Sequence, residues 1–248
     1  MGSVDSPGSI PNYQSMQVVL KTLLDPKLES YAITKPYQVL SLFPIGAQYL
    51  FVRDRSIDSI DKLKGKTVAV LDWDKSVSTI VTEMGAKPVA APLGTFAQPF
   101  NKGDADAIIA PAIAFWAFGM DKGSVKGGVF RIPVSQLSAA LIINRDLLAK
   151  KTNDLDDRVA AFHAMSAQFL DQMLNQFFTS IQHQDKDIPE KLWIDLDAPG
   201  QQAFNKFLTD TRFKMTAAGD FDPKMMKVLK KVRCSSDPKG DECSKSDE

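Results

Sequence analysis

The sequence is poor in the residues that most often build catalytic or metal sites. Its 248 residues include two cysteines and two histidines. It contains no His-Glu-x-x-His pattern and no Gly-x-Ser-x-Gly elbow, and no nucleophile stands out beside a base. We therefore predict that the chain is not an enzyme and that it uses no metal and no other cofactor.

The chain also has no net charge at neutral pH. Lys and Arg together number 30, and Asp and Glu together number 30. The chain therefore has no overall positive field to attract a phosphate backbone or an anionic membrane surface. This balance excludes nucleic acid as an expected partner.

Long hydrophobic runs are absent as well. The longest, from Ile108 to Met120, contains Pro111 and falls short of the roughly 20 residues that cross a bilayer. Residues 1–12 are rich in Gly, Ser and Pro and lack the basic and apolar parts of a secretory signal. We expect either that a leader has been removed or that upstream sequence is missing.

The two cysteines, Cys234 and Cys243, both lie near the C-terminus. No further cysteine and no nearby histidine completes a zinc site, so a local disulfide is favoured over a metal. A disulfide indicates an oxidising compartment.

The middle of the chain alternates between strand and helix patterns. Apolar segments at 67–71, 88–91 and 107–110 are separated by helical patterns at 76–84 and 96–101. This βαβαβ order is typical of a parallel sheet with helices on both faces.

Further elements are expected on both sides of this unit. Pro44 and Gly46 divide the apolar segment before it, which predicts two separate strands there. The expected strands are at 37–42, 47–52, 129–133 and 139–143. The expected helices are at 16–28, 155–178, 199–211 and 223–232.

A short acidic and aromatic segment, Asp72-Trp73-Asp74, follows the first strand of the βαβαβ unit. Open parallel sheets place their ligand crevice at the carboxyl ends of the strands. These side chains suit an amine or another cation, through ion pairing and ring contact. Asp74 or Ser76 can equally cap the next helix while Trp73 packs, and both roles can hold at once.

Residues after the next two strands extend this candidate site. Thr95 follows the second strand and Pro111 ends the third, so both are expected to line one side of a cleft. Phe115 and Trp116 are candidates for its apolar wall, although core packing is the more frequent role of such side chains.

Three segments, taken in order, resemble a known family. They read Leu-Lys-Gly-Lys-Thr-Val-Ala-Val at 63–70, Met-Gly-Ala-Lys-Pro-Val at 84–89 and Phe-Asn-Lys-Gly-Asp-Ala-Asp-Ala at 100–107. The set resembles the periplasmic solute receptors of TRAP transporters, over about residues 37–148. Residues 141–144 are similar to the family's return strand, whose final asparagine lies near the ligand. The resemblance therefore adds Asn144 to the candidate site.

The resemblance implies an α/β, periplasmic-binding-protein-like (type II) fold with two lobes and a hinge. We expect an α/β lobe at residues 49–141 and a helix-rich lobe from residues 1–48 and 142–248. The family normally opens with a βαβα unit that is missing here, so the helix-rich N-terminal lobe is expected to be truncated. Uncovered sheet edge and apolar surface would then favour a homodimer.

The implied function is reversible capture of a small solute in the periplasm, with a membrane transporter as partner. Typical TRAP receptors carry a carboxylate-binding arginine in the strand after Gly-Lys, but residues 67–70 read Thr-Val-Ala-Val. Since Asp72 and Asp74 lie close by, we expect a neutral or cationic solute.

A narrower resemblance opens an alternative. Ile-Gly-Ala-Gln-Tyr-Leu-Phe-Val at 45–52, with the closing Lys-Val-Arg-Cys and Glu-Cys segments, is similar to a receptor-like subfamily. Some of its members are described as RND efflux-pump components linked to aminoglycoside resistance. The chain lacks the membrane helices of such a pump and the heptads of an efflux adaptor. The alternative is a non-catalytic accessory protein of an efflux or envelope system, without a ligand of its own.

Overall fold

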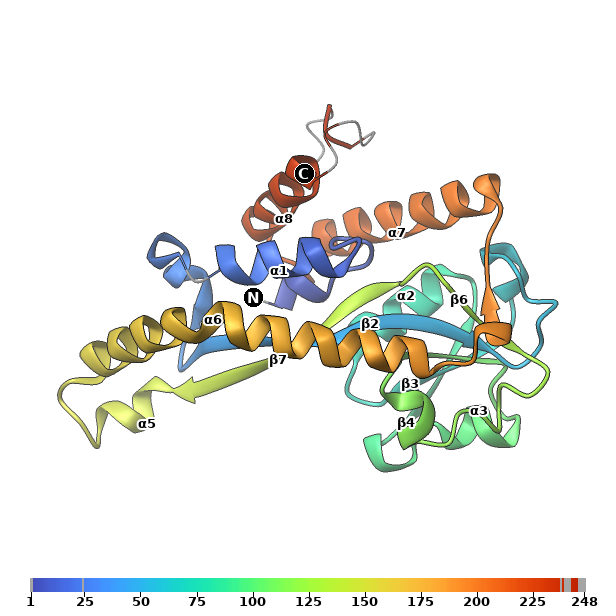
Figure 1. Ribbon diagram of the computed structural model, residues 1–248, viewed down its shortest axis with the longest axis horizontal. Helices are drawn as coiled ribbons and strands as arrows, with labels where there is room; N and C mark the ends of the chain where they lie inside the picture. Colours follow the sequence, from blue (N-terminus) through green and yellow to red (C-terminus); the bar gives the residue numbers. More distant parts are fainter. Residues whose placement is uncertain (1, 24, 237, 239–241, 245–248) are drawn as a thin grey trace.

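The computed structural model describes residues 2–23, 25–236, 238 and 242–244. A mixed sheet organises them, with strand order β4-β3-β5-β2-β6-β8 and with β1 and β7 also paired to β2 (Figure 1). The strands are β1 (Ile33–Thr34), β2 (Tyr37–Val52), β3 (Thr67–Leu71), β4 (Lys87–Ala91), β5 (Ala107–Pro111), β6 (Gly128–Phe130), β7 (Ser135–Asn144) and β8 (Trp193–Ile194).

Helices cover this sheet and extend along it. The α-helices are α1 (Tyr13–Thr22), α2 (Lys75–Glu83), α3 (Gln98–Lys102), α4 (Ala114–Ala117), α5 (Arg145–Ala149), α6 (Leu155–Asp187), α7 (Ala198–Ala218) and α8 (Pro223–Ser236). Short 3-10 helices include η1 (Gly2–Asp5), η2 (Pro26–Ala32) and η5 (Glu190–Leu192). None of the helices in the described ranges is both long and apolar enough to span a membrane.

The predicted βαβαβ unit is confirmed. It is formed by β3, α2, β4, α3 and β5, and β3 pairs in parallel with both β4 and β5. Val68, Ala69 and Val70 of the central strand are buried, as their apolar character predicts. Asp74 caps α2, and α3 ends at Gly103, whose φ of +97° favours glycine.

The two strands predicted at 37–42 and 47–52 are in fact one strand, β2, of 16 residues. Pro44 and Gly46 do not interrupt it, because the pairing of β2 with β7 shifts register between Val39 and Ser41 and again between Pro44 and Gly46. These irregularities absorb the proline and the glycine without ending the ladder. The prediction of a break was therefore wrong.

One end of β2 projects from the sheet as a two-stranded ribbon. We call this ribbon the arm: residues 37–46 of β2, paired with residues 137–144 of β7. The long helix α6 lies along it (Figure 1). The predicted helix at 155–178 is confirmed and runs further, to Asp187.

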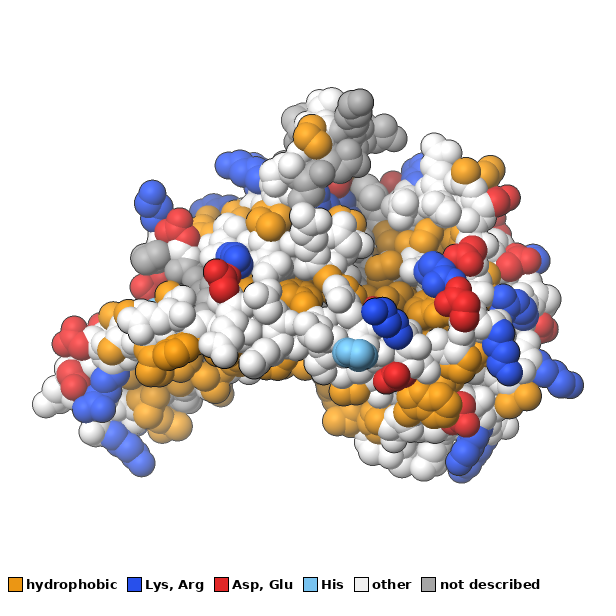
Figure 2. Space-filling model, in the orientation of Figure 1, with side chains coloured by type: hydrophobic (Ala, Val, Ile, Leu, Met, Phe, Trp, Pro, Cys, Tyr) orange, Lys and Arg blue, Asp and Glu red, His pale blue; other side chains and the backbone are white. Residues whose placement is uncertain are grey.

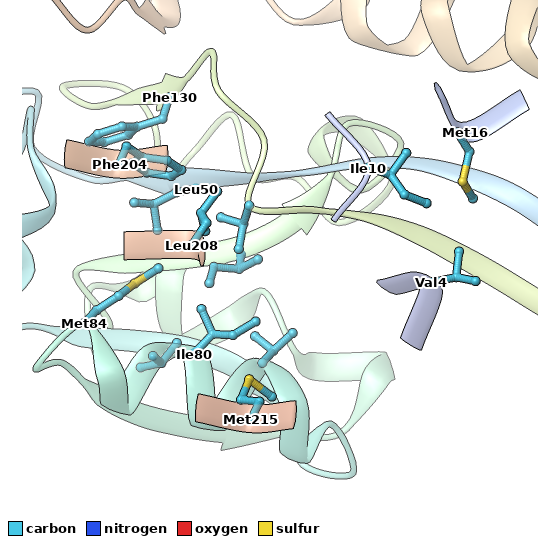
Figure 3. Packing of buried hydrophobic residues seen from close by; sticks show 14 of the residues in the cluster. Val4, Ile10, Met16, Leu50, Ile80, Met84, Phe130, Phe204, Leu208 and Met215 are labelled. Carbon is cyan, nitrogen blue, oxygen red and sulfur yellow. The ribbon is translucent and has the colours of Figure 1, made fainter. Parts of the chain in front are cut away.

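Two apolar clusters lie on opposite faces of the sheet. In the larger cluster, Phe204 and Leu208 of α7 pack near Leu50 and Phe130 of the sheet (Figure 3). The smaller cluster joins α3 and α4 to the other face through Phe100 and Phe115, among others. The predicted lobe boundaries, 48/49 and 141/142, fall inside β2 and β7, so both strands cross them, and the division into lobes stays a proposal.

The C-terminal end of the chain is tied to its first residues. The predicted Cys234–Cys243 disulfide is confirmed, with 5.5 Å between the Cα atoms. Glu242 accepts hydrogen bonds from Arg212 (2.8 Å) and Arg233 (2.6 Å), whose side chains are 1% and 6% exposed. Arg212 also donates to the carbonyl oxygen of Pro7 at 2.9 Å, and Arg233 to that of Ser9 at 3.0 Å. One carboxylate thus serves two buried guanidinium groups.

We expect Glu242→Gln to lower the free energy of unfolding by about 2–4 kcal/mol, because it removes the carboxylate that two buried guanidinium groups share. Burial alone would raise the pKa of Glu242, but Arg233 and then Arg212 outweigh it and hold that pKa below its ordinary value. Urea unfolding near neutral pH measures the difference. Glu190→Gln is the matched control, since Glu190 pairs with Arg131 at the surface, where a pair contributes about 1 kcal/mol or less. Equal effects of the two variants would contradict the prediction.

Candidate ligand-binding cleft

Three parallel strands end side by side at one edge of the sheet. Leu71 of β3 lies opposite Ala91 of β4, and β3 is also paired to β5. The segments that follow these strands therefore line a common edge, as the sequence predicts for parallel strands. These segments contain Asp72, Trp73, Asp74 and Thr95, and Pro111 is the last residue of β5.

This edge faces a hollow beside the arm. Gln48 of β2 lies opposite Pro111, the last residue of β5, and β2 is antiparallel to β5. Residues 37–47 of β2 therefore extend beyond the carboxyl ends of the parallel strands. Figure 2 shows a hollow between the arm and the α/β part, with apolar surface on both sides of it. We call this hollow the notch.

The segment after β3 provides acid and aromatic groups. Asp74 uses one carboxylate oxygen to accept from the backbone N–H of Val77 at 2.9 Å, so its capping role is real. Trp73 is 65% exposed and therefore does not pack in the core. Asp72 is also exposed, and its backbone N–H donates to the carbonyl oxygen of Ala91. The side chains of Asp72 and Trp73 are thus accessible to a solute.

Apolar side chains complete the edge. Leu93 after β4 and Ile113 after β5 are exposed, and Trp116 of α4 is 55% exposed. The indole N–H of Trp116 donates to the carbonyl oxygen of Asp187 at the end of α6, at 3.1 Å. Thr95 is exposed, and its hydroxyl lies 3.4 Å from the carbonyl oxygen of Pro92. Ile113 was not among the predicted site residues, although its place directly after β5 could have indicated it.

Phe115 does not line the notch. Its side chain is fully buried and stacks against Phe51, with 6.0 Å between ring centroids. Consecutive residues of a helix point in different directions, so α4 buries Phe115 and exposes Trp116. The placement of Phe115 in the cleft wall is corrected to core packing.

Asn144 lies far from the other candidates. It is opposite Tyr37 at the tip of the arm, roughly 35 Å along β2 from Gln48 at ~3.3 Å per residue. Its side chain caps α5 by accepting from the backbone N–H of Leu147 at 3.0 Å. The structure therefore does not bring Asn144 together with Asp72 and Trp73, and its assignment to the same site is corrected.

A further carboxylate, Asp5 of η1, lies against β7 of the arm. It accepts a hydrogen bond from the hydroxyl of Ser138 on β7 at 2.7 Å. Burial raises its pKa to about 7, the bonds from Ser138 oppose this rise, and the charge of Asp74 adds to it. The pKa of Asp5 thus depends in part on the charge of Asp74. No pattern in residues 1–12 could have indicated this role.

A partly buried polar cluster lies where β2 enters the sheet. The hydroxyl of Tyr13 donates to Asp185 of α6 at 2.6 Å and accepts from the backbone N–H of Ala47 at 3.2 Å. Burial raises the pKa of Asp185, against the effect of the hydroxyls of Tyr13 and Tyr49. Its second oxygen is buried without a hydrogen-bond partner. The cluster connects α1, α6 and β2 at the junction of the arm with the sheet.

The strand β3 corresponds to the strand that carries a carboxylate-binding arginine in typical TRAP receptors, and it contains no arginine. Residues 67–70 lie in β3, where Val68, Ala69 and Val70 are buried and apolar. Within the described ranges, no group of three or more His, Cys, Asp or Glu side chains is arranged to hold a metal ion.

Comparison with known protein families identifies the relatives of this chain. A family model described as "Solute-binding protein AdeT 1/2" matches residues 1–248. The chain belongs to the AdeT 1/2 solute-binding family. Probable solute-binding protein AdeT1 of Acinetobacter baumannii is 34% identical over 248 residues, which are 100% of this chain and 78% of that protein. Probable solute-binding protein AdeT2 of the same organism is 22% identical over 99% of this chain and 100% of its own length.

Solved structures show that the AdeT 1/2 fold is that of TRAP periplasmic solute-binding proteins. One from Desulfovibrio desulfuricans, with bound sn-glycerol-3-phosphate, matches 96% of this chain and 74% of its own at a TM-score of 0.72 and 12% identity. One from Ralstonia eutropha, with bound (S)-2-acetolactate, matches 92% and 73% at a TM-score of 0.72 and 13% identity. The predicted periplasmic-binding-protein-like fold is confirmed.

We expect Asp5→Asn to stabilise the protein increasingly as pH rises. The unfolded chain releases this proton near pH 3.8 and the folded protein only near 7, so ionisation of Asp5 costs the folded state stability across that window. The advantage of the variant should grow by roughly 1–3 kcal/mol between about pH 4.5 and about pH 8. Urea unfolding at both pH values measures it, with the exposed Asp104→Asn as control. A pH-independent difference would show that Asp5 is not buried as described.

Proposed function

We propose that this solute-binding protein captures a small neutral or cationic solute in the notch, by closure of its two lobes about β2 and β7. The observation that carries the proposal is the composition of the edge facing the arm. Asp72 and Trp73 are exposed there and Asp74 stands beside them, while β3 offers no guanidinium. Carboxylates and an indole face favour an amine, and a ring face also accepts the apolar side of a neutral solute.

Several solved TRAP solute-binding proteins of the same fold hold acids or their anions: orotic acid, L-gulonate and malonate. A carboxylate ligand would meet repulsion from Asp72 and Asp74 in this chain. This difference supports a change of ligand class within a shared fold. Capture is reversible and makes no covalent bond, so no catalytic group is required.

The proposed setting follows from the same relatives. They are periplasmic proteins, and the Cys234–Cys243 disulfide suits an oxidising compartment. A membrane transporter is the proposed partner that would receive the solute. Self-association through the helix-rich lobe is a separate proposal, since it depends on the uncovered arm and not on a ligand.

A second candidate function is an accessory protein of an efflux or envelope system, without a ligand of its own. The apolar surface on the arm favours it, because large exposed apolar patches mark protein interfaces. The two candidates differ in one measurable property, which is whether a small solute stabilises the protein.

A thermal-shift screen tests the proposal. The probes are primary amines, an aminoglycoside, a neutral sugar and dicarboxylates. A solute at a hundredfold excess over its Kd should stabilise the folded protein by about 2.7 kcal/mol. We expect shifts with amines or with the sugar. A shift with dicarboxylates alone would overturn the ligand class, and no shift with any probe would favour the accessory function.

Variants then locate the site. For any amine that binds, Asp72→Asn and Trp73→Ala should each weaken binding about tenfold or more, since each removes a contact of about 1.4 kcal/mol or more. Isothermal titration measures the Kd. Asp104→Asn is the control, because Asp104 is exposed at the opposite end of β5. Unchanged binding in both site variants would place the ligand elsewhere.

A further inference from the structure

In the arm, α6 lies along β2, but one stretch of β7 has exposed side chains on both faces. Four consecutive residues of β7 are exposed: Ala139, Ala140, Leu141 and Ile142, the last at 53%. Successive side chains of a strand point to opposite faces, so this run shows that both faces are open there. At the inner end of the same strand, Ser135 and Gln136 are buried.

The outer edge of this stretch is also open. Among the described residues, β7 pairs with β2 alone, and no backbone group of residues 139–142 bonds to another element. An antiparallel strand directs alternate N–H and C=O groups away from its partner, so half of these groups face outward. A two-stranded ribbon is marginally stable in water, and an open edge is a template for a further strand.

Apolar side chains of neighbouring elements enlarge this surface. More than half of the large exposed apolar side chains in the described part of the chain belong to the arm, α5 and α6. Apolar surface along this side of the molecule is visible in Figure 2. The residues are Tyr37, Leu141, Ile142, Leu147, Met165, Phe169 and Phe177. We call this set the arm patch.

The charges beside the arm patch are balanced, which bears on what can cover it. Arg145 pairs with Asp156 and Arg158 with Asp154. Four further exposed charges, two of each sign, lie at the same corner: Asp146, Lys150, Lys151 and Asp157. A strongly acidic or basic partner would gain no net electrostatic attraction from this surface. A second copy of the same surface carries charges of both signs, so each charge of one copy can face an opposite charge of the other.

We propose that the arm patch binds a second copy of this chain, with the outer edges of the two β7 strands paired antiparallel about a twofold axis. Identical strand edges pair in this way without further adaptation, because each offers the same donors and acceptors in reversed order. The pairing extends the ribbon to four strands and covers Leu141 and Ile142 of both copies.

Analytical ultracentrifugation over a range of concentrations tests the proposal. We expect a reversible dimer for the unmodified protein, and Ile142→Lys should weaken it about tenfold or more, which corresponds to 1.4 kcal/mol or more. Val125→Lys is the matched control, since Val125 is 77% exposed and lies outside the arm patch. A monomer at all concentrations, or a dimer that Val125→Lys alone weakens, would overturn the proposal.

Disulfide trapping tests the geometry of the strand pairing. Its result does not depend on whether Ile142→Lys alters the stability of the fold. Both natural cysteines are bonded to each other, so a single added cysteine reports on one position. We expect Ala140→Cys to form a covalent dimer on mild oxidation and Ala217→Cys, exposed at the end of α7, not to do so. Equal cross-linking at both positions, or at Ala217 alone, contradicts β7 pairing. The solute screen on the same samples is independent of either result.

Discussion

The continuity of β2 is the constraint on which the rest of the structure depends. This one strand pairs with β5 and β6 at its inner end and with β7 along the arm. If it ended at Pro44, the arm would be joined to the α/β part through β7 and loops alone. Because it continues, the carboxyl edge of the parallel strands faces a ribbon of fixed direction, and the notch exists. Tyr13 and Asp185 fix the point where the strand enters the sheet.

The notch combines groups from distant parts of the sequence. Its α/β side offers Asp72 and Trp73, directly after a buried strand, while Asp5 of η1 is hydrogen-bonded to Ser138 of the arm strand β7. Asp5 and Asp74 repel each other across the boundary between the proposed lobes. Under the proposed function, a positively charged solute placed between such groups would lower that repulsion.

Local signals were sufficient to predict the βαβαβ unit and the edge that carries Asp72, Trp73 and Asp74. Apolar strand segments and a helix-capping aspartate can each be recognised from a few consecutive residues. Long-range effects were not predictable in this way. The sequence cannot show that pairing with β7 absorbs Pro44 and Gly46, or that α4 turns Phe115 inward and Trp116 outward. Asn144 was misplaced because the resemblance supplied its role, and the structure puts it at the tip of the arm. The role of Asp5 could not be predicted, because it lies in a segment without a periodic pattern of apolar residues.

The shared carboxylate of Glu242 also orders events in time. A ribosome releases Pro7 and Ser9 more than two hundred residues before Arg233, whose guanidinium later binds the carbonyl oxygen of Ser9. Glu242 emerges after Arg233, and the Cys234–Cys243 bond can form only after both cysteines have been synthesised. The contacts between Ser9, Arg233 and Glu242 therefore form only after almost the whole chain has been made.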